Sequence, residues 1–144
     1  MLEHLVTDYN GMLAHESMLL NGVRERLLNL SSHLRLHVLT ADAFGIARSQ
    51  LNGLPCDLVI LPTEEQAQAK LAYTQCLGED QVFAIGNGRC DYLMLHSAAL
   101  RMAVIQGEGA AMEICLAADV AVPDILAALD LLLFPRRLIA TLRG

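Results

Sequence analysis

The feature that most constrains this chain is a regular alternation of short apolar runs with longer stretches of helical spacing. The runs predict five or six strands, over residues 4–8, 34–40, 56–61, 81–85 and 103–106, with a possible sixth over 118–122. Strands that alternate with helices form βαβ units, so we expect an α/β fold with a mostly parallel sheet. Nearly every strand residue is apolar, which is typical of a Rossmann-like sheet covered by helices on both faces.

The segments between these runs carry helix start and stop signals. Helices are predicted over residues 21–30, 41–51, 63–76, 89–100, 124–133 and 136–142, with Pro135 separating the last two. Thr63 is expected to cap the third helix, because Gln66 follows it at capping-box spacing. Gly53 and Gly78 are expected to end the second and third helices.

Length and composition narrow the class of protein. A chain of 144 residues suits one domain, 1–144, and a hydrophobic share of 54% excludes intrinsic disorder. No apolar run reaches the roughly 18–20 residues of a membrane span, and the N-terminus does not resemble a signal peptide. The net charge of −6 argues against a nucleic-acid or anionic-membrane partner.

The four cysteines are scattered along the chain and form no C-x-x-C pair. They are Cys56, Cys76, Cys90 and Cys115. This usage predicts reduced thiols and a cytoplasmic location rather than disulfides or structural zinc. The five histidines also lack ligand spacing, which leaves zinc chemistry or a nucleophilic cysteine without support.

Candidate site residues follow from where the strands end, because sites of open α/β sheets lie beyond the carboxyl ends of the strands. Asp8 ends the first strand and opens a polar turn that closes at Gly11, and Thr40 ends the second strand. The fourth strand runs into a Gly86–Asp91 loop, whose two glycines let the backbone approach a ligand. Taken singly, these residues also suit a turn acid, a helix cap and a glycine-rich turn.

Lys70 is the only lysine in the chain, since every other basic residue is arginine. A chain that uses arginine everywhere else needs an ammonium group here for a phosphate or a carboxylate pair, or simply carries a solvated helical lysine.

In order, these residues resemble the motifs of the haloacid dehalogenase-like (HAD) superfamily, especially its small soluble relatives of the P-type ATPase catalytic domain. The Asp8–Leu13 segment (DYNGML) resembles the first motif, Thr40 the second, Lys70 the third and Gly86–Asp91 (GNGRCD) the fourth. The resemblance covers roughly residues 2–121.

The resemblance implies a Mg²⁺-dependent phosphohydrolase in which Asp8 attacks phosphorus and forms an aspartyl phosphate. Mg²⁺ would screen the repulsion between that carboxylate and an anionic ester. The implied roles are catalysis for Asp8, Asn10 and Lys70; phosphate binding for Gly11, Thr40, Ala41 and Lys70; and metal binding for Asp8, Asn10, Asn87 and Asp91. The implied substrate is a phosphorylated small molecule or a nucleotide.

Two departures from the family pattern bear on turnover, and a third, at Cys90, has no physical explanation in the sequence. Asn10 stands where most phosphatases of the superfamily carry an acid–base Asp, a function typically worth about 10²–10⁴-fold. Asn87 replaces a metal-binding Asp with a neutral ligand, and Cys90 replaces an Asn of the ATPase pattern. We therefore expect low turnover. The alternative is a degenerate module that binds phosphate or a protein without turnover.

The chain has no room for a cap domain, since residues 13–34 accommodate a single helix. An open site suits a large substrate or a neighbouring subunit that covers it, which leaves a homo-oligomer as one alternative. The apolar stretch 125–142 packs on its own sheet or forms a dimer contact.

Two other folds fit less well. A phosphate-accepting receiver domain needs its Asp after the third strand, where Pro62 and Thr63 stand. A dinucleotide-binding motif is suggested only by residues 107–112, in which Met112 replaces the third glycine.

Overall fold

In a computed structural model that describes residues 1–42 and 45–144, six strands of the described chain form one sheet, in the order β5-β4-β1-β6-β7-β8. They are β1 (His4–Asp8), β4 (Arg35–Thr40), β5 (Cys56–Ile60), β6 (Val82–Gly86), β7 (Leu100–Val104) and β8 (Val120–Val122). Every neighbouring pair is parallel. The predicted α/β fold with a mostly parallel sheet is confirmed.

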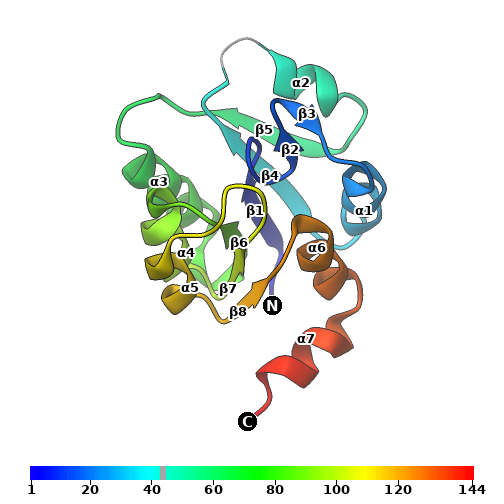
Figure 1. The fold of residues 1–144 in the computed structure, drawn as a ribbon, viewed down its shortest axis with the longest axis vertical. Helices are drawn as coiled ribbons and strands as arrows, with labels where there is room; N and C mark the ends of the chain where they lie inside the picture. Colours follow the sequence, from blue (N-terminus) through cyan, green and yellow to red (C-terminus); the bar gives the residue numbers. More distant parts are fainter. Residues whose placement is uncertain (43–44) are drawn as a thin grey trace.

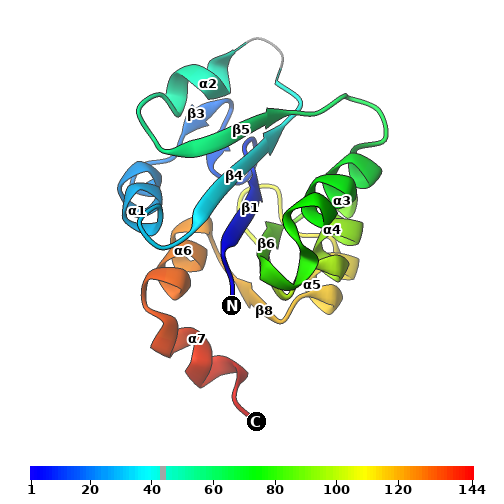
Figure 2. The ribbon, with the colours of Figure 1, turned by 180° about the vertical axis from the view of Figure 1, so that it is seen from behind.

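Helices cover both faces of this sheet, as Figures 1 and 2 show from opposite sides. One face is covered by α1 (Val23–Leu30) and α6 (Ile125–Leu133), and the other by α3 (Gln66–Leu77), α4 (Tyr92–Ser97) and α5 (Met112–Ala117). The short helix α2 (Ile46–Gln50) lies at one end, and α7 (Pro135–Leu142) extends away from the body at the other. No helix of the described residues is both long and apolar enough to span a membrane.

The two hydrophobic cores follow from the alternation of side chains along each strand. In β1, Leu5 packs with the α1 and α6 residues Leu27 and Leu129, whereas Val6 packs with the α4 residue Met94 on the other face. Because successive strand residues point to opposite faces, a strand between two helical layers must be apolar on both sides. This explains why the strands read as nearly continuous apolar runs.

Several predicted boundaries differ from the structure. The helix predicted from Thr63 begins at Gln66, after Glu65 in a left-handed conformation (φ 55°), and the Gln66 side chain donates to the Pro62 carbonyl. Thr63 therefore does not cap it. The fifth strand covers 100–104 rather than 103–106.

The helical stretches also differ in part from their predictions. The helix predicted over 89–100 consists of a 3₁₀ turn, η2 (Arg89–Asp91), followed by α4, and α5 was not predicted. A further 3₁₀ turn, η1 (Glu79–Gln81), precedes β6. Of the helix predicted over 41–51, residues 46–50 form α2, and positions 43–44 lie outside the described residues.

A short hairpin follows β1 where the sequence predicted only one helix. Its strands are β2 (Ala14–His15) and β3 (Met18–Leu19), joined by Glu16 and Ser17, both with positive φ. Two consecutive left-handed residues give the turn twist that suits a two-residue hairpin. The Tyr9 hydroxyl donates to the Ser17 carbonyl (2.7 Å), which ties the hairpin to the end of β1.

A polar group around the buried His37, which we call the histidine cluster (His4, His37 and Tyr73), lies between β1, β4 and α3. The two ring nitrogens of His37 lie 2.7 Å from the Tyr73 hydroxyl and 3.0 Å from Nδ1 of His4. His37 is 1% exposed, and burial together with the neighbouring His4 lowers its pKa to about 4. The imidazole is therefore neutral near pH 7, when one nitrogen donates and the other accepts.

Candidate active site

The candidate site lies at the carboxyl edge of the sheet, where the strand order reverses. From β1 the chain adds β4 and β5 on one side, and it later returns to place β6 on the other side of β1. Asp8 at the end of β1 and Thr40 at the end of β4 are thereby brought to one edge, next to the loop after β6. Such a switch point is where open α/β sheets bind ligands.

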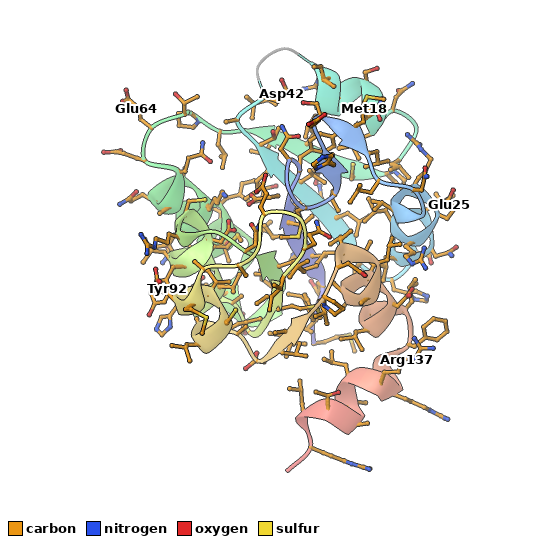
Figure 3. All side chains as sticks on the ribbon, in the orientation of Figure 1. Met18, Glu25, Asp42, Glu64, Tyr92 and Arg137 are labelled. Atoms are coloured by element: carbon orange, nitrogen blue, oxygen red, sulfur yellow. The ribbon has the colours of Figure 1, made fainter. Side chains whose placement is uncertain are left out.

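A cavity of about 430 Å³ opens at this edge. Five of the residues predicted from the sequence line it, namely Asp8, Asn10, Thr40, Ala41 and Lys70. They come from β1, from β4 and its following loop, and from α3. Figure 3 shows Asp42, another lining residue, at the same end of the molecule as Met18 of β3 and far from Arg137 of α7.

Lys70 joins the two predicted acids into one buried group, which we call the lysine cluster (Asp8, Lys70, Cys90 and Asp91). The Lys70 Nζ lies 2.8 Å from Asp8 Oδ1 and 2.8 Å from Asp91 Oδ1. The exposed fractions of the Lys70, Asp8 and Asp91 side chains are 4%, 16% and 0%. Acids 83 residues apart in sequence thus share one ammonium group away from water.

Asp91 is fixed on its other side by the loop that contains it. Its Oδ2 accepts hydrogen bonds from the backbone N–H groups of Asn87 (3.0 Å) and Gly88 (3.1 Å). A Cβ atom at Gly86 would lie 2.7 Å from the Cβ of Asp91, so the close approach of this loop requires glycine. Both Asp91 oxygens are therefore engaged within the protein: Oδ2 is held by the loop, and Oδ1 fixes the position of the Lys70 ammonium group.

The electrostatics of the cluster are unbalanced, with two carboxylates for one ammonium group. Burial and the charge of Asp91 raise the pKa of Asp8 above its ordinary value, although Lys70 opposes this. Burial opposes the charge of Lys70, but the two carboxylates outweigh it and raise the Lys70 pKa. Lys70 therefore stays charged, whereas Asp8, whose negative charge the protein compensates only in part, takes up a proton more readily than an ordinary Asp.

Cys90 also contacts Lys70, with 3.2 Å between its Sγ and Nζ. Burial and the charge of Asp91 raise the pKa of the Cys90 thiol, while Lys70 lowers it. The sequence showed that a cysteine stands at this position but gave no reason for it.

The phosphate-binding predictions divide into two groups. Thr40 lines the cavity, and its oxygen accepts from the Asp42 N–H (3.1 Å), which leaves its hydroxyl proton to donate. Gly11 does not line this cavity, and its N–H already donates to the Ala14 carbonyl (2.9 Å). Gly11 instead lies against the Glu108 carboxylate, which leaves no room for a Cβ at Gly11.

The oxygen ligands that a metal would need are mostly neutral. The Asn87 amide nitrogen donates to the Gly109 carbonyl (3.3 Å), which does not engage its side-chain oxygen. The Asn10 side-chain oxygen accepts from the Ser17 N–H (3.0 Å), which leaves the Asn10 backbone carbonyl for a metal. Among residues 1–42 and 45–144, no three His, Cys, Asp or Glu side chains are grouped to hold a metal ion.

Sequence reasoning did not single out six residues that line the cavity, namely Tyr9, Ser17, Leu39, Asp42, Ile46 and Gln66. Tyr9 follows β1, Ser17 lies in the β2–β3 turn, and Ile46 begins α2. Gln66, at the start of α3, had been noted only as a capping residue.

No model of a known protein family matches this chain, but one protein sequence and several solved structures are similar to it. The uncharacterized protein MJ0073 of Methanocaldococcus jannaschii is 49% identical over 63 residues, which cover 44% of this chain and 68% of that protein.

Solved structures are similar at lower identity. The 3-deoxy-D-manno-octulosonate 8-phosphate phosphatase of Moraxella catarrhalis, in complex with magnesium, phosphate and the sugar acid, has a TM-score of 0.70 at 16% identity. The match covers 99% of this chain and 94% of that one.

The cobalt-bound form of the corresponding Haemophilus influenzae phosphatase has a TM-score of 0.73 at 16% identity, covering 98% of this chain and 89% of that one. A proposed HAD family hydrolase of Streptomyces avermitilis has a TM-score of 0.66 at 15% identity. The match covers 85% of this chain and 76% of that one. The chain belongs to one family with the MJ0073 protein, and its fold is that of the HAD hydrolases.

Proposed function

We propose that the chain is a Mg²⁺-dependent phosphohydrolase that forms an aspartyl phosphate on Asp8 and turns over slowly. The observation that carries the proposal is the bridge from Lys70 to Asp8 and Asp91, 2.8 Å on each side, at the edge of a cavity. Such a buried and imperfectly compensated carboxylate is expected at a functional site. The phosphatases that share the fold support the reaction class.

The residues of the cavity suit the first half of this reaction. Asp8 attacks the phosphorus of a bound ester, and the ester oxygen leaves with a proton from water. Lys70 holds Asp8 in place and offsets negative charge as the phosphoryl group approaches. The Thr40 hydroxyl donates to a phosphoryl oxygen, and Asp91 keeps the ammonium group oriented.

The donor set fits Mg²⁺, a hard cation that prefers oxygen ligands and retains several waters. Asp8, the Asn10 carbonyl and the Asn87 side-chain oxygen would hold the ion. When bound, it would screen the repulsion between the carboxylate and the phosphoryl oxygens. Only one of these ligands is charged, so we expect weak affinity.

Low turnover follows from Asn10. Hydrolysis of the acyl phosphate needs a group that removes a proton from the attacking water, and an amide does not accept that proton near neutral pH. The Asn10 side-chain oxygen is further engaged by the Ser17 N–H. The phosphorylated protein is therefore expected to accumulate.

The decisive experiment is intact-mass measurement after reaction with acetyl phosphate or para-nitrophenyl phosphate in the presence of Mg²⁺. One added phosphoryl group is expected in the native chain and none in Asp8→Asn. Asn10→Asp should speed breakdown of the adduct by up to about 10²–10⁴-fold. An aspartate at this position also accepts the Ser17 hydrogen bond, so the substitution preserves the local contact.

The substitution Asn87→Asp tests the proposed metal site. Calorimetric titration should show that Asn87→Asp binds Mg²⁺ more tightly than the native chain, because the substitution adds an anionic ligand. Unchanged or weaker binding would remove Asn87 from the proposed ligand set.

The second candidate is a degenerate module that binds phosphate or a partner protein without turnover. Asn10 and Asn87, where the family pattern has acids, favour it. It becomes the better account if no donor yields an adduct or turnover and Asn10→Asp is also inert. A panel of phosphorylated small molecules and nucleotides then identifies the substrate or the ligand.

A further inference from the structure

The ammonium group of Lys70 has three N–H donors and, among the residues that the structure describes, three neighbours that accept hydrogen bonds. Asp8 Oδ1 and Asp91 Oδ1 lie 2.8 Å away, and Cys90 Sγ lies 3.2 Å away. The side chain is only 4% exposed, so water does not readily supply another acceptor. Each donor of Lys70 is thus engaged by one member of the lysine cluster.

The three acceptors differ in strength. Two are carboxylates, which form charge-assisted bonds of about twice the strength of neutral ones. The third is an uncharged thiol, and sulfur is a weak acceptor. Asp91 is also fixed by two backbone N–H groups, so its position relative to Lys70 is set by the loop. The Cys90 contact is the one most easily given up.

A phosphoryl oxygen in the cavity competes for the same ammonium group. Lys70 lines the cavity next to Asp8, the proposed nucleophile, and it has no donor to spare. To hold the oxygen, Lys70 must release one of its partners. Release of Asp91, which is 0% exposed, would leave a buried charge without its cation, and release of Asp8 would give up a charge-assisted bond.

We propose that Cys90 is the exchangeable partner of Lys70: its thiol occupies the third N–H while the site is free and yields it to a phosphoryl oxygen on binding. The inference rests on the proposed function, since it assumes that the cavity binds phosphoryl groups. Cys90 is then a positioning residue that tunes phosphate affinity through Lys70 and does not itself touch the substrate.

Substitutions of Cys90 should change phosphate affinity in opposite directions. In Cys90→Ser a hydroxyl oxygen of similar size accepts the third N–H more strongly, so phosphate should bind roughly three- to tenfold more weakly. In Cys90→Ala the third N–H lacks an acceptor, so phosphate should bind more tightly by a similar factor. The thermal midpoint of the free protein should fall in Cys90→Ala and hold or rise in Cys90→Ser.

The probe is inorganic phosphate, titrated by calorimetry with Mg²⁺ present into the native chain and both variants. The matched control is Cys115→Ser, which alters a partly buried thiol on α5 that is not among the three neighbours of Lys70. The control should bind phosphate as the native chain does.

A spectroscopic readout tests the exchange directly. The infrared S–H stretching band of Cys90, isolated by subtracting the Cys90→Ser spectrum, should shift when phosphate saturates the native chain. A thiol with a purely structural role would not respond. This readout and Cys90→Ala also carry the test if Cys90→Ser fails to fold.

The outcomes separate this inference from the proposed function. If the native chain, both Cys90 variants and the control bind phosphate equally well, the proposed exchange between Cys90 and phosphate at Lys70 is overturned. The phosphohydrolase proposal would then still stand. An S–H band that phosphate does not move would have the same two consequences. If the native chain binds no phosphate, both proposals fail together.

Discussion

Helix α3 carries Lys70 into the lysine cluster and, one turn later, Tyr73 into the histidine cluster. Both groups lie between α3 and the sheet, and each has a buried member at its centre, His37 in one and Lys70 in the other, yet their charges differ. In the histidine cluster His37 is neutral near pH 7, and its two ring nitrogens have partners at 2.7 and 3.0 Å. The lysine cluster holds two carboxyl groups for one ammonium group, and burial together with the charge of Asp91 raises the pKa of Asp8 to about 7.

The difference shows where in the molecule an incompletely compensated charge is tolerated. A neutral group whose hydrogen bonds are all satisfied can lie inside a fold at little penalty, whereas a buried excess charge cannot. The incompletely compensated Asp8 carboxyl group lies at the cavity edge, where a cation can reach it. The satisfied group lies beneath α3, where its partners are all protein. Three substitutions test this contrast.

The largest effect is expected from Lys70→Met. It leaves Asp8 and Asp91 buried without a cation, and removing one partner of a buried pair typically lowers the free energy of unfolding by about 3–5 kcal/mol. Urea denaturation measures the loss, and intact mass should show no phosphoryl adduct. Adding Asp8→Asn should restore part of the stability but not the adduct. Arg48→Met, which removes an exposed cation, is the control. If the Lys70→Met protein were as stable as the native chain, the carboxyl groups of the lysine cluster would not depend on Lys70, and the contrast with the histidine cluster would be wrong.

A smaller loss of stability is expected when the pH is lowered, because unfolding allows His37 to take up a proton. The pKa of His37 is about 4 in the folded chain against 6.5 ordinarily, so the unfolded chain binds the proton first as pH falls. Stability is therefore full above about pH 6.5 and is lost between there and pH 4, by up to about 3 kcal/mol. Asp57 and Arg35 also face the ring, with Asp57 Oδ2 3.7 Å from Nδ1.

The measurement is urea denaturation across this pH range for the native chain and His37→Gln, an amide that keeps one donor and one acceptor. The variant should lose much of the acid dependence, and His33→Gln, at an exposed histidine, should not. Equal acid dependence in all three proteins would mean that the destabilising proton binds elsewhere.

The smallest effect is expected from Tyr73→Phe, which deletes the hydroxyl that bonds His37 at 2.7 Å. Loss of one such bond lowers the free energy of unfolding by roughly 1 kcal/mol. The yield and lifetime of the phosphoryl adduct should not change, because the two clusters act separately. An altered adduct lifetime in a protein of near-native stability would show that Tyr73 transmits to Lys70 along α3.

The features that the sequence predicted are those with a local signal. Apolar runs mark strands buried on both faces, and the carboxyl-end rule then places Asp8 and Thr40 at one edge. Lys70 stood out because no other lysine is present. These inferences need only residue type and spacing, and the structure brings the three residues to one cavity.

What the sequence could not predict depends on backbone conformation or distant partners. The β2–β3 turn uses Glu16 and Ser17 in left-handed conformations, where the usual signal is Asn-Gly or a similar pair. The start of α3 likewise depends on Glu65 with positive φ, which no capping rule anticipates. Asp91 was predicted to bind metal, and only the structure shows its second oxygen facing two N–H groups.

The burial of the only lysine has a practical consequence for proteolysis. An endoproteinase specific for lysine has a single target in this chain, the bond after Lys70, and that bond lies within helix α3. Cleavage requires α3 to unwind, so the rate at which the chain divides into fragments 1–70 and 71–144 measures local opening of the helix. Ligands that grip the ammonium group should slow the cut, which turns one protease into a label-free binding assay.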